Sequence, residues 1–201
     1  MLQTGTNYKI SQEKRRKYPP NIAYYDASAR QSAYELKEGL VKLFRSHHIQ
    51  SRELVIKCIG SDRSTGDSLG PLIGYKLEKF HIPGISVRGT LSEPVHAANL
   101  AENLELINSS YRHPFVLAVD ASLGTHEHIG YVTLSEGPLR PGLGVKKELP
   151  DVGDIHITGI VNFSGMMESL LLQTTRLSMV MQLADVISKA ILYGITEYYE
   201  M

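Results

Sequence analysis

Two aspartates of this sequence, Asp67 and Asp120, have the residue type and the setting for acid–base chemistry. Asp120 directly follows an apolar run, Phe115 to Val119, and a carboxyl group at that place has to find solvent or polar partners in a cleft. Asp67 follows a loop of small polar residues, Gly60 to Gly66, that comes after another apolar run. When two carboxyl groups share a cleft, one tends to stay protonated near neutral pH while the other ionises. Such a pair can carry out the acid and base steps of amide hydrolysis through a water molecule, or it can hold a divalent metal ion.

Each of these signals also has a simpler interpretation. Asp67 fits the cap of a helix, where aspartate accepts backbone N–H groups without any catalytic role. The glycine-rich loop before it fits phosphate binding, but it has no lysine before a serine or threonine, and the charge of Asp67 opposes a phosphate. The histidines that could assist a metal-dependent hydrolysis, His126, His128 and His156, have no cysteine nearby and lack a strong metal-ligand spacing. We therefore expect no metal ion or other cofactor.

Four polar residues near the two aspartates are expected to contact a substrate. Asp62 and Arg63 lie in the glycine-rich loop, and Ser68 and Ser122 lie shortly after the two acids. Arg63 can stabilise the negative charge that develops during hydrolysis. The alternative for Asp62 and Arg63 is that they pair with each other within the loop.

Short apolar runs alternate with segments of helical periodicity from residue 28 onward. Strands are expected at 54–59, 85–89, 115–119, 129–134 and 155–161, and helices at 28–48, 67–80, 95–107, 164–172 and 176–199. Strands separated by helices of about 10 to 15 residues indicate right-handed crossovers and a mostly parallel sheet with helices on both faces. The sequence thus predicts an α/β fold, a three-layer α/β/α sandwich. Ligands bind beyond the carboxyl ends of the strands in such sheets, so Asp67 and Asp120 should face one cleft.

The length of 201 residues fits one domain. Residues 1–25 are polar and contain two consecutive prolines, which predicts a flexible arm, and residues 26–201 are expected to form a single α/β domain. The long apolar helix at 176–199 can pack on the sheet, or it can support a homo-oligomer. Met166 and Met167 lie in an amphipathic stretch and are expected in the core or in an interface.

The composition excludes some classes of partner. Lysine plus arginine equals aspartate plus glutamate at 21 each, so no net field attracts nucleic acid or an anionic membrane, and the basic cluster at 13–17 is short. No segment approaches the ~20 apolar residues of a membrane span, and the N-terminus lacks the residue order of a signal peptide. The lone cysteine, Cys58, is expected to be a buried thiol in a reducing compartment. We expect a cytoplasmic protein that binds neither nucleic acid nor membranes.

Three motifs resemble a known family. The stretches GDSLGP at 66–71, VDASLG at 119–124 and PGLGVKKE at 141–148 resemble the spore germination protease and, more closely, its sporulation-specific relatives in spore-forming Firmicutes. The resemblance covers residues 50 to 195 and extends in fold to the hydrogenase maturation endopeptidases. It implies a phosphorylase/hydrolase-like three-layer sandwich in which Asp67 and Asp120 are the catalytic pair of an aspartic-type peptidase. In the hydrogenase-type relatives such acids bind nickel together with a histidine, and the segment where that histidine is sought here, 161–164, reads VNFS.

These observations predict a sporulation or germination endopeptidase that hydrolyses a protein or peptide substrate with paired aspartates. The alternative is a catalytically inactive protein that recognises a peptide or a metal centre through the same cleft during sporulation. The two differ in what they need from Asp67 and Asp120, because hydrolysis requires both carboxyl groups near one water molecule, whereas recognition tolerates asparagine at either place. Either role places the protein in the cytoplasm of the sporulating cell or forespore.

Overall fold

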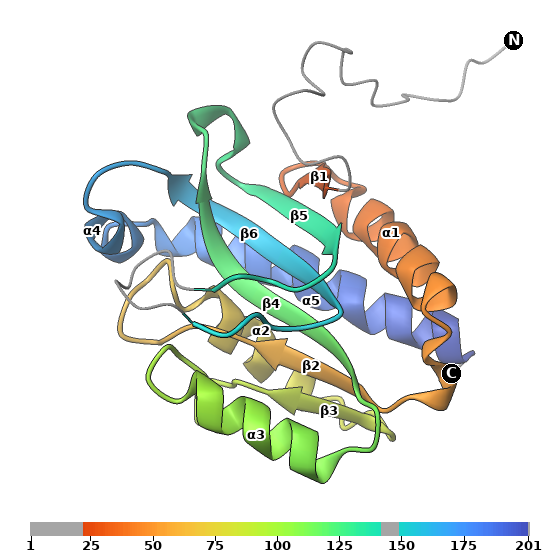
Figure 1. Ribbon diagram of the computed structural model, residues 1–201. Helices are drawn as coiled ribbons and strands as arrows, with labels where there is room; N and C mark the ends of the chain where they lie inside the picture. The colour runs from red at the N-terminus through yellow and green to blue at the C-terminus, as the bar shows by residue number, and fades with distance from the viewer. Residues whose placement is uncertain (1–21, 142–148, 201) are drawn as a thin grey trace, which may run out of the picture.

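The computed structural model describes residues 22–141 and 149–200, which form a six-stranded sheet flanked by helices (Figure 1). The strands are β1 (Ile22–Asp26), β2 (Leu54–Cys58), β3 (Ile85–Arg88), β4 (Phe115–Gly124), β5 (Tyr131–Glu136) and β6 (Ile155–Phe163). The helices are α1 (Ser32–Ser46), α2 (Leu69–Glu78), α3 (Leu100–Ser110), α4 (Glu168–Gln173) and α5 (Leu177–Tyr199), with short 3-10 turns η2 (Ile49–Ser51) and η3 (His126–His128). The order across the sheet is β1-β5-β6-β4-β2-β3.

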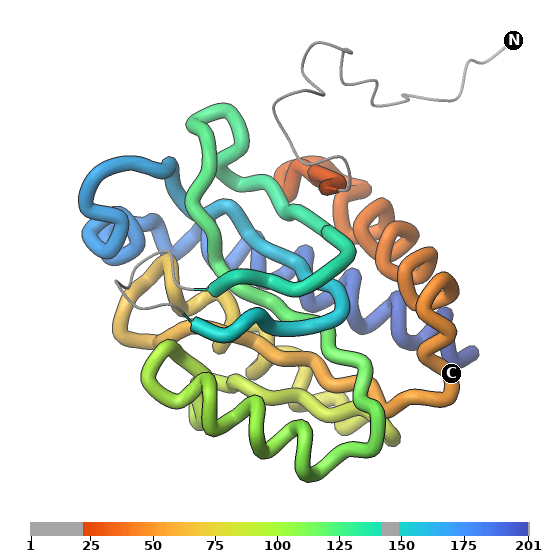
Figure 2. The backbone as a smooth tube through the Cα atoms, viewed as in Figure 1, coloured from red at the N-terminus to blue at the C-terminus, as the bar shows by residue number. Residues whose placement is uncertain are grey.

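Most neighbouring strands run parallel. The strands β6, β4, β2 and β3 form a parallel block, and β5 is antiparallel to both β6 and β1. A parallel pair needs a crossover connection, which α2 supplies between β2 and β3 and α3 supplies between β3 and β4. By contrast, the chain turns back directly from β4 into β5, as the backbone trace shows (Figure 2). The expected mostly parallel sheet is confirmed.

Helices cover both faces of this sheet. On one face α1, α2 and α5 pack around the main core, which includes Phe44, Ile56, Ile73, Leu117 and Ile187. On the other face Leu100 of α3 packs in a smaller cluster with Ala118 and Val152. The strands between them read as continuous apolar runs because both of their faces are buried. The three-layer α/β/α sandwich expected from the sequence is confirmed, and of the helices in the described part of the chain α3 is the one on its second face (Figure 1).

β4 is longer than the apolar run that predicted it. β2 ends at Cys58, but β6 continues to pair with β4 up to the partners Gly124 and Phe163. Asp120 therefore lies within β4 rather than just past its end. The sequence did not reveal this extension because the polar residues after Val119 interrupt the apolar pattern.

Several other expected boundaries differ from the structure, and two of them have a clear physical reason. The arm expected over residues 1–25 overlaps β1, which pairs antiparallel with β5 as an edge strand that is only partly buried and so leaves a weak apolar signal. Residues 1–21 lie outside the described residues. The helix expected from Val95 begins at Leu100, because Val95 first forms a parallel bridge with Ile59.

Within the described ranges, α5 is the one helix long and apolar enough to cross a membrane by length and composition. Its most apolar window is 56% buried, and the helix contacts α1, α2 and the sheet. We interpret α5 as the central core helix of the fold. Cys58 is fully buried as expected, and burial raises the pKa of its thiol well above the ordinary value.

The two methionines at the start of α4 are not core residues. Met166 is 92% exposed and Met167 is 68% exposed, which corrects the expectation of a core position. The physical reason is the place of α4, which lies at the end of the sheet beyond β6 instead of over one of its faces (Figure 1).

Candidate active site

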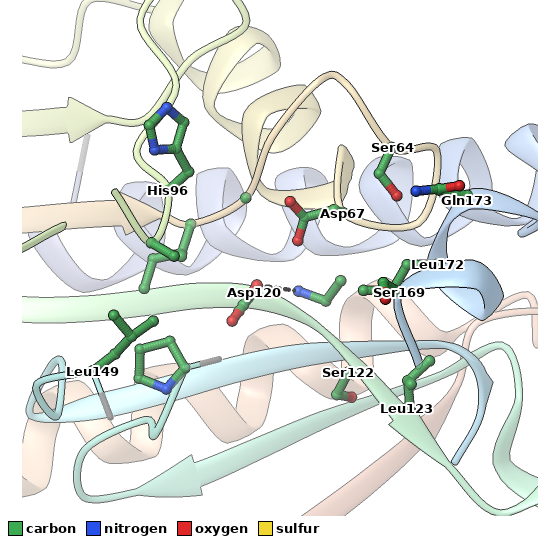
Figure 3. Close-up of a pocket in the computed structure, with 15 residues that line it drawn as sticks. Ser64, Asp67, His96, Asp120, Ser122, Leu123, Leu149, Ser169, Leu172 and Gln173 are labelled. Carbon is green, nitrogen blue, oxygen red and sulfur yellow. Dashed lines mark hydrogen bonds between the residues drawn. The ribbon is translucent and has the colours of Figure 1, made fainter. Parts of the chain in front are cut away.

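A pocket of about 190 Å³ opens at the carboxyl ends of β2 and β4. Its walls come from the loop after β2, the segment after β3, β4 itself, α4 and the segment that follows β5 (Figure 3). The polar side chains that line it are Ser64, Asp67, His96, Asp120, Ser122, Ser169 and Gln173. The structure thus brings Asp67 and Asp120 into one pocket at the end of the sheet where ligands bind in parallel folds.

Asp67 is held by a turn that begins directly after β2. The N–H of Gly60 donates to the carbonyl of Val95 at 2.8 Å, and the N–H of Ser61 donates to the carbonyl of Asp67 at 3.1 Å. Gly60 has a φ of +142°, and a Cβ at this position would lie 2.0 Å from the Asp67 carbonyl oxygen. Only glycine therefore allows the loop to pass so close to Asp67.

The first turn of α2 also frees the Asp67 side chain. The cap position of α2 belongs to Ser68, not to Asp67, which argues against the simple interpretation of Asp67 as a helix cap. The helix lies very close to the end of β2, since a Cβ at Gly70 would lie 2.0 Å from the carbonyl oxygen of Ile59. This close contact fixes the start of α2, and with it Asp67, against the sheet.

Asp120 is placed by the most regular part of the sheet. Its strand is paired on both sides up to Val119, whose carbonyl accepts a hydrogen bond from the N–H of Ile59 at 2.7 Å. Asp120 is only 8% exposed, and its Oδ1 accepts a hydrogen bond from the N–H of Ala121 at 2.7 Å. Asp120 is therefore a rigidly held, poorly hydrated carboxyl group.

The two acids differ in their electrostatic surroundings. Burial raises the pKa of Asp120 well above its ordinary value, and the nearby charge of Asp67 raises it further, while the Ala121 N–H opposes the shift. Burial also raises the pKa of Asp67, but the Ser61 N–H and the charge of His96 both lower it. The pair is thus unequal: Asp67 ionises first, and Asp120 keeps its proton to higher pH.

His96 is a member of the pocket that our reading of the sequence missed. It follows β3 in a segment held by Asn99, whose side-chain oxygen accepts the N–H of His96 at 2.8 Å. In Figure 3 its ring lies above Asp67. A polar residue after the carboxyl end of a parallel strand is a candidate for the site, but the apolar pattern predicts a helix that begins at Val95 and so hides this one.

The family model described as "Protein of unknown function (DUF1256)" matches residues 23–190. The chain belongs to this family. The protein YyaC of Bacillus subtilis (strain 168), described as uncharacterized, is 45% identical over 181 residues, which cover 90% of this chain and 84% of YyaC. The crystal structure of a NiFe hydrogenase maturation protease, HycI from Thermococcus kodakarensis KOD1, is similar with a TM-score of 0.45 and 17% identity, over 77% of this chain and 99% of that chain. The matched family region includes both Asp67 and Asp120.

The four residues that the sequence predicts to contact a substrate do not all lie in the pocket. Ser122 lines the pocket, but its hydroxyl donates to Thr158 Oγ1 at 3.0 Å within the sheet. Asp62 and Arg63 are exposed and Ser68 is buried, and these three are not among the residues that line the pocket. Any contact of Asp62 or Arg63 with a substrate would therefore be made outside the pocket.

Residues 66–70 match the pattern G-x-S-x-G, which contains the serine nucleophile in some hydrolases. The structure does not support that role for its serine. Ser68 is buried, its hydroxyl donates to the Thr65 carbonyl at 2.7 Å, and it does not line the pocket. The titratable side chains that line the pocket are Asp67, Asp120 and His96.

The other histidines weighed for metal binding lie apart from the acids. His126 stacks on Phe163 with ring centroids 4.3 Å apart, and His156 contacts the carbonyl of Gly137 through Nδ1. Within 22–141 and 149–200, no group of three or more His, Cys, Asp or Glu residues is arranged to hold a metal ion. In the segment 161–164, where the resemblance to the hydrogenase-type relatives places a histidine, Asn162 donates to the carbonyl of Leu171 at 2.9 Å and so holds α4 in place.

Proposed function

We propose that this protein is an endopeptidase that hydrolyses a peptide bond with Asp67 and Asp120 as a carboxyl pair. The observation that carries the proposal is the unequal surroundings of two acids in one pocket. Burial raises the pKa of both acids, and the charge of Asp67 raises that of Asp120 further, whereas the Ser61 N–H and the charge of His96 partly lower the raised pKa of Asp67. An enzyme that needs an acid and a base at the same pH obtains them by such a difference between two carboxyl groups.

The proton transfers follow from this difference. Asp67, ionised, takes a proton from a water molecule as the water oxygen attacks the scissile carbonyl carbon, and Asp120, protonated, donates its proton to the carbonyl oxygen. The N–H of Ala121 binds Oδ1 of Asp120, so Oδ2 is the oxygen that carries the proton. When the tetrahedral intermediate collapses, Asp67 gives its proton to the leaving nitrogen, and Asp120 regains its own as the carbonyl forms again. The C–N bond breaks, and both acids return to their first state.

The biological setting that we propose is sporulation or germination, in the cytoplasm of the sporulating cell or forespore. The motifs that resemble the spore germination protease at 66–71 and 119–124 each contain one of the two acids. The relative YyaC comes from a Bacillus. The proposed substrate is accordingly a protein or peptide of the spore.

The direct test is cleavage by the purified full-length protein. Small acid-soluble spore proteins and a broad library of short peptides are incubated with it, with and without EDTA, and the products are identified by mass spectrometry. We expect cleavage at defined bonds that EDTA leaves unchanged. Failure of the folded protein to cleave any of them contradicts the peptidase and leaves peptide recognition as its role, whereas cleavage that EDTA abolishes points to metal-dependent hydrolysis instead.

Replacement of His96 by Asn should shift the acid side of the pH–rate profile to higher pH. The charge of His96 lowers the pKa of Asp67, so without it Asp67 holds its proton to a higher pH and is a base over a narrower range. The measurement is kcat/KM against pH, in which the alkaline side, set by Asp120, should not move. The matched control is His126→Asn, since His126 does not line the pocket. An acid side that stays in place in His96→Asn contradicts this role.

A further inference from the structure

The pocket contains a stretch of β4 edge beside which no strand lies among residues 22–141 and 149–200. β4 pairs with β2 only up to Cys58 and Val119, while its other side remains paired with β6 up to Gly124. β2 cannot follow, because the chain turns away at Gly60 and hydrogen bonds to Val95 instead. On the side of the missing β2, the segment Ala121 to Leu123 forms a wall of the pocket next to Asp120.

The direction of the backbone groups on this edge follows from two hydrogen bonds. The carbonyl of Val119 accepts the N–H of Ile59 on the β2 side, and the carbonyl of Gly124 accepts the N–H of Ser164 on the β6 side. Because successive residues of a strand direct their backbone groups to opposite sides, the carbonyls of Ala121 and Leu123 point to the β2 side, which is the pocket. The pairing of β2 with β4 ends at Val119, and no turn or loop N–H within 22–141 or 149–200 donates a hydrogen bond to either carbonyl.

A partner of a specific kind fits this edge. Unpaired backbone groups along a strand are a template for another extended chain, and peptide recognition by strand addition uses them. We propose that the substrate binds as an extended polypeptide that continues the sheet beside β4 at Ala121 to Leu123. This inference rests on the proposed function. Its backbone then passes Asp120 at the point where Asp67 enters the pocket from the other wall.

α4 supplies apolar contacts for the same chain. Its residues Ser169, Leu172 and Gln173 line the pocket, and the carbonyl of Leu172 accepts the N–H of Gly66 at 2.8 Å, which joins α4 to the loop that carries Asp67. Met166 and Met167, just before α4, and Leu170, on α4, do not line the pocket itself and are 92%, 68% and 50% exposed. Flexible methionines adapt to different apolar side chains. The inferred substrate therefore carries an apolar side chain that lies on α4 next to the scissile bond.

The test uses binding, so that it does not depend on cleavage. The probe is the tightest-binding sequence from an immobilised library of short peptides with one central leucine or methionine, labelled with fluorescein and titrated with the full-length protein by anisotropy at low temperature. A series of the same peptide, each with one backbone nitrogen methylated, is then titrated. Each lost backbone hydrogen bond should weaken binding by about tenfold, and only every second position should show this loss.

Two matched leucine variants test the contact with α4. Leu170→Glu, on α4 next to the pocket-lining Ser169, should weaken binding of the probe by about tenfold, whereas Leu106→Glu, at a leucine that is 56% exposed on α3, should leave it unchanged. Equal effects of the two substitutions, or methylation effects without a period of two, overturn the inference. So does the absence of any library peptide that binds.

The outcomes separate this inference from the proposed function. Binding with the alternating methylation pattern but without cleavage supports strand addition and contradicts the peptidase. Cleavage that is insensitive to methylation away from the scissile bond supports the peptidase and contradicts strand addition.

Discussion

Asp120→Asn should abolish measurable peptide cleavage while it makes the protein more stable near neutral pH. The substitution removes the acid that protonates the carbonyl oxygen, which should lower kcat by about 100- to 10,000-fold. Stability should rise by about 1 kcal/mol, because the buried carboxyl group next to the charge of Asp67 is replaced by a neutral amide. The Oδ1 of asparagine can still accept the N–H of Ala121, so the local structure should be kept.

The sign of the pH dependence is set by the raised pKa of Asp120. The folded protein binds this proton more tightly than the unfolded chain, so the stability from the protonated form is complete below the ordinary carboxyl pKa and is lost as pH rises through the raised value. The stability advantage of Asp120→Asn should therefore grow with pH across that window. Urea denaturation at a series of pH values measures it.

Asp67→Asn provides the comparison for Asp120→Asn. It should lose cleavage to a similar extent because the base is removed, and the raised pKa of Asp120 should fall since one cause of its shift, the charge of Asp67, is gone. The wild-type pH–rate profile should be bell-shaped, with both sides above the ordinary carboxyl range. Retention of full activity by either folded variant contradicts the carboxyl-pair mechanism.

Gly60→Ala should destabilise the fold strongly and displace Asp67. The added Cβ would lie 2.0 Å from the carbonyl oxygen of Asp67 and 3.0 Å from the Pro71 ring, at a φ of +142°. Since both neighbours are held against the sheet, we expect a loss of about 2 to 4 kcal/mol in the free energy of unfolding and a displaced Asp67. Thermal or urea denaturation measures the first effect, and the cleavage or peptide-binding assay measures the second.

Gly84→Ala is the matched control for Gly60→Ala. Gly84 also has a positive φ, +77°, but a Cβ there meets nothing within 4 Å, so the change should cost only about 1 kcal/mol and leave the pocket intact. The difference between the two variants isolates the clash with Asp67 from the backbone preference of glycine. Equal losses in the two variants would show that the close passage of the loop does not constrain Asp67.

Much of the fold was predictable because its signals are local. The apolar runs at 54–59 and 115–119 belong to strands buried on both faces, so their side chains are apolar at every position and their identity as core strands follows from the sequence. The long helix at the C-terminus was equally clear. β1 was not, because Ile22–Asp26 is an edge strand with only partial burial and gains its conformation from pairing with β5, more than a hundred residues further along the chain.

For the candidate site, the sequence determined the identity of the two acids and the end of the sheet at which they lie. This was possible because Asp67 and Asp120 each follow a strong strand signal, and the ends of parallel strands meet at one edge. Only the tertiary structure decided that His96 joins them, that Asp62 and Arg63 stay outside the pocket, and that β4 continues past the end of its pairing with β2. These features depend on contacts between segments far apart in the chain, such as the one between Ile59 and Val95, and no local pattern of residue types encodes them.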